Sequence, residues 1–378
     1  MLLVIYIGTI MYAFLSGYFV PLLTGISYSK KRFFWIWCTL LLLLMSVTTA
    51  TYNYADVETY QTQFNLANIY KVPVNELNDI GLGLYLLFRI SYMLSLNYRG
   101  MMLIAIILCM FLLHKSMDFI PLNENIFWGF FLIFPGIIEI IQIKYFLGSS
   151  IVIYSFKYLV QDKKYSILKF IIGIFIAYLF HSACIVFLLL LIVKFIKNKK
   201  CSVSLKITLI GTFVMFLLLR FIPGIADKFF ASVRIERYLG NLATQASMYN
   251  FFQVISSWLI MVIISIYCYL KLSQNNSIIE KNQLLNVVFK NYTALCVLGI
   301  TLPLLTYDLN FFRFIEISFI FGYIVISIYF NEIISVKNII IIGVLIIVLY
   351  LTYHFYSGGN GTPLFQYDGW VNIFQIGE

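Results

Sequence analysis

A short polar stretch, TYNYADVETYQTQFN at residues 51–65, carries the first side chains that could do chemistry. A carboxylate such as Asp56 or Glu58 can act as a general base toward a sugar hydroxyl, and a tyrosine ring stacks on the apolar C–H face of a sugar. Asp56 and Glu58 are two residues apart and do not share a helical face, whereas Asp56 and Tyr60 do. We expect one acid to point into a site; an aromatic belt at the membrane surface is the alternative interpretation.

Two further ionisable residues lie in or beside apolar runs. His181 lies within AYLFHSACIVFLLLL, and Lys144 lies between EIIQI and YFLGSS. Because charge is expensive inside a bilayer, an ionisable residue in such a run is a functional candidate by default. The small residues at 148–150 would let helices approach closely, so that Lys144 could face a phosphate. The alternatives are a structural core histidine and an ordinary lysine at a helix end.

The arginines are distributed differently from the lysines. Under the orientation argued below, six of the seven arginines fall in or near the outer half of the membrane. This runs against the usual bias of basic residues toward the cytoplasmic side. The planar fork of arginine binds phosphate through two hydrogen bonds, so we expect an anionic, phosphate-bearing ligand in the outer leaflet. For any one arginine, snorkelling to lipid headgroups or pairing with a nearby acid is the alternative. The six are Arg89, Arg99, Arg220, Arg234, Arg237 and Arg313.

The composition predicts the elements that must position these residues. Of the 378 residues, 62% are hydrophobic and 11% are charged, whereas soluble domains carry about 25% charged residues. The apolar runs are continuous and do not alternate as barrel strands do. We predict a single membrane domain over 1–378, an all-α polytopic bundle with about 12 spans (roughly 11–14). The apolar segments lie near 2–22, 33–51, 79–96, 100–114, 126–142, 145–160, 167–181, 184–197, 203–222, 250–271, 285–305, 310–330 and 337–356.

The lysines predict the orientation, because cytoplasmic loops carry an excess of Lys and Arg. The first connection contains Lys30, Lys31 and Arg32 and is therefore expected inside. Further lysine-rich connections are expected on the same side, near 163–164, 194–200 and 271–281. The N-terminus then lies outside, and three outer segments would cover the site: 52–80, 223–249 and 357–378.

Two segments need separate treatment. If all the apolar segments crossed, the QDKK loop at 161–164 would fall outside, against the lysine bias. We therefore expect 79–96, which carries Arg89, to be a re-entrant or interfacial helix. Basic residues at both ends of 167–197 predict two short helices that meet at His181.

Several chemistries have no motif in the chain. The six cysteines show no CxxC spacing, so neither a disulfide framework nor a cysteine metal site is expected. Walker, GxSxG and HExxH motifs are absent, and the three histidines are far apart. The net charge of +10 is scattered over loop ends, which indicates topology signalling and not nucleic-acid binding.

The arrangement resembles the EpsG/Wzy-like family of bacterial polymerases that make exopolysaccharide, capsule and O-antigen. IAYLFHSA is the most specific of the shared motifs. The chain departs from the family pattern at Lys144-Tyr145, where Arg-Gln is usual, so Lys144 would act as a point charge. The motifs are D-x-x-x-Y at 56–60, GLGLYLLFRI at 81–90, a basic residue opening a small-residue helix at 144, IAYLFHSA at 176–183 and F-x-R-F at 311–314.

The resemblance implies a glycosyltransferase that needs no metal, nucleotide or other cofactor. Such proteins transfer an undecaprenyl-diphosphate-linked glycan to the terminal sugar of an incoming lipid-linked repeat unit, on the periplasmic or extracellular face of the bacterial inner membrane. Implied partners are the lipid-linked glycan, membrane lipids, a chain-length regulator and a flippase. The implied roles are diphosphate binding by Lys144, Arg234, Arg237 and Arg313, catalysis by Asp56 or His181, and substrate binding by Tyr60, Glu58, Arg89 and Asp308.

Three other functions remain open at this point. A GT-C type glycosyltransferase that uses a polyprenyl-monophosphate sugar would also place an acid in the first outer loop, but it would need fewer basic partners. A flippase or transporter of lipid-linked oligosaccharide would need two pseudo-symmetric halves, and no repeat is evident. An O-acyltransferase would need a buried His with an Asp, and His181 alone supports it poorly.

Overall fold

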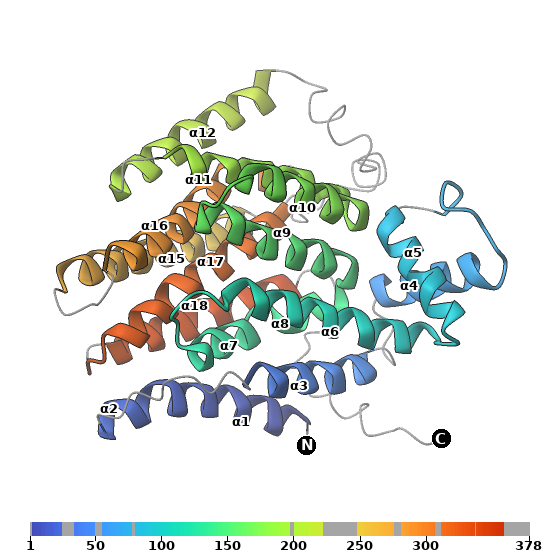
Figure 1. Ribbon diagram of the computed structural model, residues 1–378, viewed down its shortest axis with the longest axis horizontal. Coiled ribbons are helices and arrows are strands. Elements are labelled where there is room, and N and C mark those ends of the chain that lie inside the picture. The colour runs from blue at the N-terminus through green and yellow to red at the C-terminus, as the bar shows by residue number, and fades with distance from the viewer. Residues whose placement is uncertain are drawn as a thin grey trace.

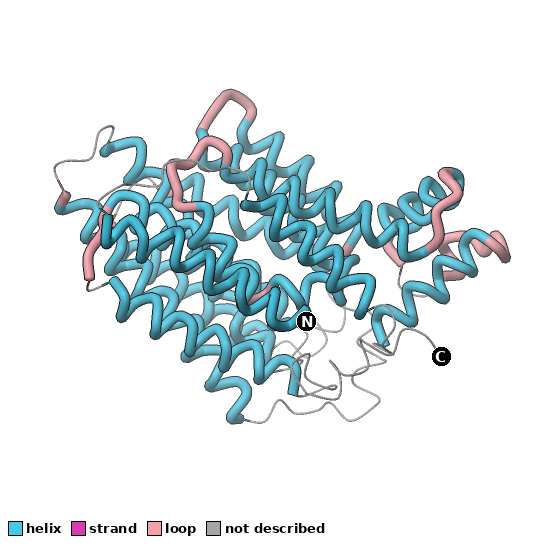
Figure 2. The backbone as a smooth tube through the Cα atoms, turned by 90° about the horizontal axis from the view of Figure 1, so that it is seen from below, coloured by secondary structure: helices cyan, strands magenta, loops and turns pink. Residues whose placement is uncertain are grey.

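The computed structural model describes residues 2–24, 34–49, 55–77, 80–196, 200–221, 248–275, 281–306, 311–336 and 338–358, and in these ranges it contains helices and no strand (Figures 1 and 2). In chain order the elements are α1 (Leu2–Phe14), η1 (Leu15–Phe19), α2 (Val20–Thr24), α3 (Phe34–Thr49), α4 (Ala55–Asn68), α5 (Leu82–Met93), α6 (Tyr98–Met117), α7 (Glu124–Ile133), α8 (Gly136–Ile141), α9 (Ile143–Gln161), α10 (Ser166–Phe180), η2 (Ser182–Leu191), α11 (Ile192–Phe195), α12 (Cys201–Phe221), α15 (Met248–Gln274), α16 (Lys281–Leu298), η4 (Gly299–Thr306), α17 (Phe312–Glu332) and α18 (Asn338–Gly358).

The helices form a bundle typical of a multi-pass membrane protein. Within the described residues six helices are long and apolar enough to cross a membrane, and several shorter apolar helices accompany them. The side chains of α16, η4 and α17 are buried almost throughout, so these elements form the centre. Peripheral helices expose large apolar side chains such as Leu209 and Ile340, as helices that face lipid do. The all-helical membrane class is therefore confirmed, while the number of crossings stays a prediction.

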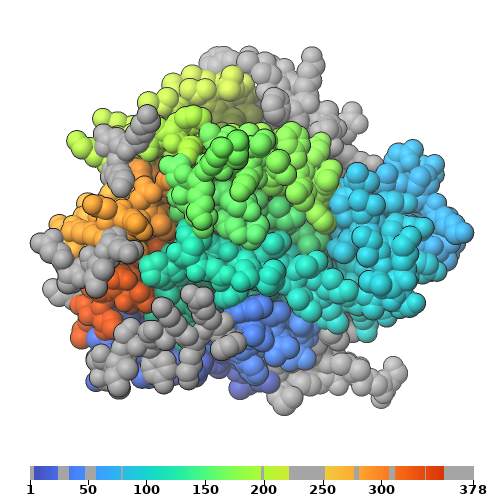
Figure 3. All heavy atoms as spheres, viewed as in Figure 1, coloured from blue at the N-terminus to red at the C-terminus, as the bar shows by residue number. Residues whose placement is uncertain are grey.

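Helices α4 and α5 lie at one end of the bundle, where they form a separate lobe at the right of Figures 1 and 3. They are joined by hydrogen bonds to backbone carbonyls: Arg89 Nη1 donates to Ala67 O (3.0 Å) and Asn68 Nδ2 donates to Phe88 O (3.3 Å). A Cβ on Gly81 would lie 2.3 Å from Leu179 O, so only glycine lets α5 begin against the end of α10. Helix α5 starts and ends at this same end of the bundle, the geometry expected of a helix that does not cross.

The apolar segment predicted at 126–142 is divided between two helices. It breaks at Phe134–Pro135 into α7 and α8, because proline has no N–H to continue the helical ladder. The carbonyls freed at the break are satisfied by tyrosines from other helices: Tyr6 donates to Leu132 O, and Tyr323 donates to Phe134 O at 3.0 Å. Such partners are what permits a broken helix inside a membrane protein.

The region 167–197 forms the predicted pair of short helices. Helix α9 ends at Gln161, and the next residue, Asp162, has a φ of 56°, the left-handed conformation common after a helix. Helix α10 then runs to His181, and η2 with α11 returns, so that Lys194 forms an ion pair with Asp162 and lies 3.3 Å from Ser166 Oγ. The two arms meet at His181, which confirms the prediction. Lys290 of α16 holds the base of this hairpin by donating to the carbonyls of Leu159 (2.9 Å) and Val160 (3.0 Å).

Candidate functional site

Ionisable side chains from α8, α9, α17 and the α10–η2 junction converge inside the bundle. We call this set the buried cluster. Glu139, Lys144, Tyr145 and Glu316 are almost fully removed from solvent, whereas His181 and Arg313 are partly buried. Electrostatic interactions link each member to at least one other member. The buried cluster consists of Glu139, Lys144, Tyr145, His181, Arg313 and Glu316.

The side chains of His181 and Arg313 lie in contact, with 3.4 Å between Arg313 Nη1 and His181 Nε2. The other ring nitrogen, His181 Nδ1, accepts a hydrogen bond from the backbone N–H of Ala183 at 3.2 Å, which caps the start of η2. A neutral imidazole whose Nδ1 accepts must carry its proton on Nε2. Both groups therefore present N–H donors toward the same small volume, a pair that an anionic oxygen placed between them would satisfy.

Tyr145 connects this donor pair to α9. Its hydroxyl donates to the backbone carbonyl of Arg313, which ties the first turn of α17 to α9. Its ring lies edge-on to the imidazole of His181, with centroids 5.3 Å apart, and Arg313 Cζ lies 5.8 Å from the centre of the same ring. Lys144, one residue earlier and 6% exposed, is near enough for its charge to act on His181. The side chain of Tyr145 therefore fixes the position of the Arg313 guanidinium relative to the His181 imidazole.

Gly148 allows the hairpin tip to approach α9. A Cβ at this position would lie 2.6 Å from Cys184 Sγ and 3.5 Å from His181 Cβ. Contacts below about 3.0 Å do not occur without movement of a neighbour. The small residue that follows Lys144 thus serves close helix packing, as the sequence predicted, and it fixes how far His181 stands from the α9 backbone.

Two members of the cluster, Glu139 and Glu316, were not singled out by the sequence analysis. Their side chains are 1% and 0% exposed. Ser149 Oγ lies 3.5 Å from Glu139 Oε1, but Glu139 Oε2 and both carboxylate oxygens of Glu316 accept no hydrogen bond from the described residues. The signal was present, because both acids interrupt apolar runs, the property that identified His181.

The comparison with protein-family models gives one match, to the EpsG family, over residues 34–368. The chain belongs to the EpsG family. No curated protein and no solved structure matches it. The matched range contains the whole buried cluster, and membership together with the helical membrane architecture fits a polysaccharide polymerase in general.

The remaining predicted site residues of this EpsG-family chain lie elsewhere. Glu58 is exposed on α4, and Tyr60 packs against the apolar core. Arg89 makes the hydrogen bond from α5 to the backbone of α4 described above. Asp56 lies in the first turn of α4, but its side chain is outside the described residues. The structure therefore brings together Lys144, His181 and Arg313. Also outside the described residues are Arg234, Arg237, Asp308 and most of 223–249 and 357–378.

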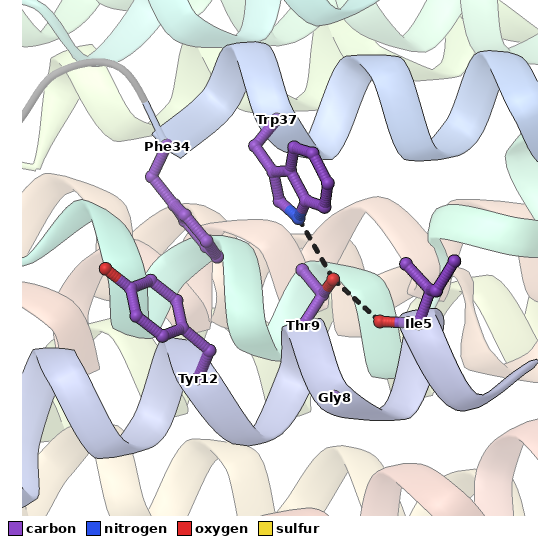
Figure 4. A pocket seen from close by; sticks show the side chains of 6 residues that line it. All are labelled: Ile5, Gly8, Thr9, Tyr12, Phe34 and Trp37. Carbon is purple, nitrogen blue, oxygen red and sulfur yellow. Dashed lines mark hydrogen bonds between the residues drawn. The ribbon is translucent and has the colours of Figure 1, made fainter. Parts of the chain in front are cut away.

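A groove lies between α1 and α3, and none of its lining residues belongs to the buried cluster (Figure 4). Its volume is about 490 Å³, and no charged side chain lines it. Its main polar group, the hydroxyl of Thr9, accepts from Trp37 Nε1 at 3.0 Å and donates to Ile5 O at 2.8 Å. The groove offers apolar surface and no reacting group. The groove is lined by Ile5, Gly8, Thr9, Tyr12, Phe34 and Trp37.

Within the described residues of this EpsG-family chain no group of three or more His, Cys, Asp and Glu could hold a metal ion.

Proposed function

We propose that this EpsG-family chain is a polysaccharide polymerase that transfers a polyprenyl-diphosphate-linked glycan onto the terminal sugar of an incoming lipid-linked repeat unit, at the outer face of a bacterial inner membrane. The observation that carries the proposal is the pair of facing donors, Arg313 Nη1 and His181 Nε2, 3.4 Å apart. Lys144 adds a positive charge nearby. These groups suit the oxygens of a diphosphate.

The reaction requires no nucleotide because the diphosphate is itself the leaving group. The acceptor hydroxyl oxygen attacks the anomeric carbon of the donor glycan and forms the new glycosidic bond. The bond between that carbon and the diphosphate oxygen breaks, and the electron pair leaves with the diphosphate. N–H donors fixed in advance around the leaving oxygens would stabilise the developing charge. With its proton on Nε2, His181 serves this end of the reaction, and the acceptor proton needs another group.

Reconstitution tests the proposal. The full-length protein is placed in proteoliposomes with a defined undecaprenyl-diphosphate repeat unit, and polymer ladders are followed over time. We expect the wild type to produce ladders and Arg313→Gln to slow them by about 10²–10³-fold, the usual effect of removing one donor to a developing oxyanion. Arg313→Lys is expected between the two, because it keeps the charge and loses the planar fork.

Arg99→Gln is the matched control. Arg99 is exposed at the start of α6, outside the buried cluster. We therefore expect the Arg99→Gln variant to produce the same polymer ladders as the wild type. A wild type that produces no ladder, or an Arg313→Gln variant with undiminished ladders, would contradict the proposal. Movement of the lipid-linked unit across the bilayer without elongation would assign the chain to transport instead.

A further inference from the structure

Among the described residues, the buried glutamates Glu139 and Glu316 combine a carboxyl group with almost no hydrogen bonding. Three of their four carboxylate oxygens accept no hydrogen bond from the described part of the chain, although both side chains are almost completely buried. Buried polar groups in folded proteins nearly always have partners, and each exception requires a reason. Removing a carboxylate from water without compensation is costly, so a partner supplied by substrate is a physical explanation for such a position.

Glu316 stands beside the pair of facing donors. It follows Arg313 by three residues on α17, so the two side chains share one face of that helix. Arg313 attracts the Glu316 carboxylate, and the phenol of Tyr145 interacts electrostatically with Glu316, Glu139 and Arg313. A substrate whose phosphate contacts Arg313 would thus bring its reacting sugar close to Glu316.

The other members of the cluster are unsuited to accept a proton. His181 uses the lone pair of Nδ1 for the Ala183 N–H and carries a proton on Nε2. Lys144 and Arg313 are cations, and the hydroxyl of Tyr145 donates to the Arg313 carbonyl. Only the two glutamates retain open acceptor oxygens. Of these, Glu139 faces the Ser149 hydroxyl at 3.5 Å, whereas Glu316 has both oxygens open.

We propose that Glu316 is the catalytic base that takes the proton of the acceptor sugar hydroxyl, an inference that rests on the proposed function. As the acceptor oxygen bonds to the anomeric carbon, its proton passes to a carboxylate oxygen of Glu316. The bond from that carbon to the diphosphate breaks in the same step, and the diphosphate leaves toward Arg313 and His181. Glu316 later returns the proton to water. The acceptor therefore binds on the Glu316 side of the donor pair, with its reactive hydroxyl against this carboxylate.

The test separates turnover from donor binding in the proteoliposome assay. Glu316→Gln keeps the shape of the side chain and removes the base. We expect polymerisation to slow by about 10²–10⁴-fold, the usual contribution of a general base. Donor binding, measured as inhibition by undecaprenyl diphosphate, is expected to stay within about twofold of the wild type, whereas Arg313→Gln weakens it. Glu332→Gln, at the other end of α17, is the matched control and should leave both quantities unchanged.

A measurement on the wild type covers the case in which Glu316→Gln fails to fold. Dicyclohexylcarbodiimide modifies buried carboxyl groups in apolar surroundings, and mass spectrometry locates the adduct. We expect modification at Glu316 to rise in step with the loss of polymerisation, and a bound acceptor analogue to prevent both. Full polymerisation with Glu316 modified would overturn the inference, as would Glu316→Gln with wild-type turnover or with donor binding lost to the same extent as turnover. A wild type that makes no polymer contradicts the proposed function instead.

Discussion

The buried cluster combines two basic side chains with two acids. Arg313 lies close enough to Glu139 and Glu316 for its charge to act on both, and the charge of Lys144 acts on His181. An isolated buried charge would cost several kcal/mol, so the nearby acids reduce the cost of placing these cations inside the bundle. In the proposed reaction the diphosphate leaves toward Arg313 while Glu316 takes the acceptor proton, so one face of α17 serves both halves of the reaction.

Gly148→Ala tests the geometry at this scale. The added methyl group would meet Cys184 Sγ at 2.6 Å, so Cys184 must shift. We expect this shift to move the hairpin tip and to displace His181 relative to Arg313. Displacement of a catalytic group by about 1 Å can cost about 10²-fold, and we expect polymerisation to slow by about 10–100-fold while the protein stays folded.

A second substitution distinguishes displacement from general damage. Cys184→Ala in the Gly148→Ala background removes the sulfur that the new methyl group meets, so activity should return in part. Gly343→Ala is the matched control, because its Cβ would meet no atom within 4 Å. Equal activity of Gly148→Ala and Gly343→Ala would show that the spacing of His181 from α9 does not matter.

The residues of the cluster were predictable one by one, and their association only in part. Lys144, His181 and Arg313 were found because ionisable groups are rare in apolar runs and because the family resemblance pointed to the same positions. Glu139 and Glu316 obey the same rule but were passed over in favour of the outer-loop acids. No local pattern states that His181 and Arg313, which are 132 residues apart, lie in contact. That information resides in the packing of α9, η2 and α17.

Among the elements, the short hairpin decides how deep the site lies. Helix α10 has 15 residues, which at about 1.5 Å per residue spans about 22 Å, less than the roughly 30 Å of a bilayer core. With its base at Asp162 on one surface, its tip at His181 would stop inside the membrane. Basic residues at both ends predicted this hairpin. The break between α7 and α8 was not predicted, because tyrosines from distant helices supply the hydrogen bonds that make it tolerable.

Lys290→Met tests the base of the hairpin. Lys290 is 8% exposed, and its ammonium donates to two carbonyls of the last turn of α9. Hydrogen bonds to a charged group contribute about 1.5–3 kcal/mol, so we expect the free energy of unfolding to fall by about that amount. Thermal unfolding of the purified protein in detergent measures the change. Lys206→Met on α12 is the control, because Lys206 is exposed and should lower stability by no more than about 0.5 kcal/mol. Equal stability of the two variants would assign Lys290 a role in topology alone.

For the whole molecule, the buried cluster and the ion pair of Lys194 with Asp162 lie toward opposite ends of the α10–η2 hairpin. The start of α5 packs against Phe180, the residue before His181, so the lobe of α4 and α5 and the hairpin tip share one end (Figure 1). The ion pair of Lys194 with Asp162 lies at the other end of the same hairpin. Since lysines mark the cytoplasmic side, the end with the cluster is the outer one in our proposal. The number of crossings was harder to predict, because short and broken helices blur the relation between apolar length and span.

Cysteine labelling in intact cells tests this orientation. Glu58 is exposed on α4, and Lys163 is exposed in the loop between α9 and α10. We expect Glu58→Cys to react with a membrane-impermeant maleimide in intact cells, and Lys163→Cys to react only after permeabilisation. The wild type is a suitable background, because five of its six cysteines are buried and Cys201 is partly buried. The opposite labelling pattern would place the cluster on the cytoplasmic side, where a glycan carried on the outer leaflet could not reach Arg313, and the proposed reaction would have to be abandoned along with the orientation.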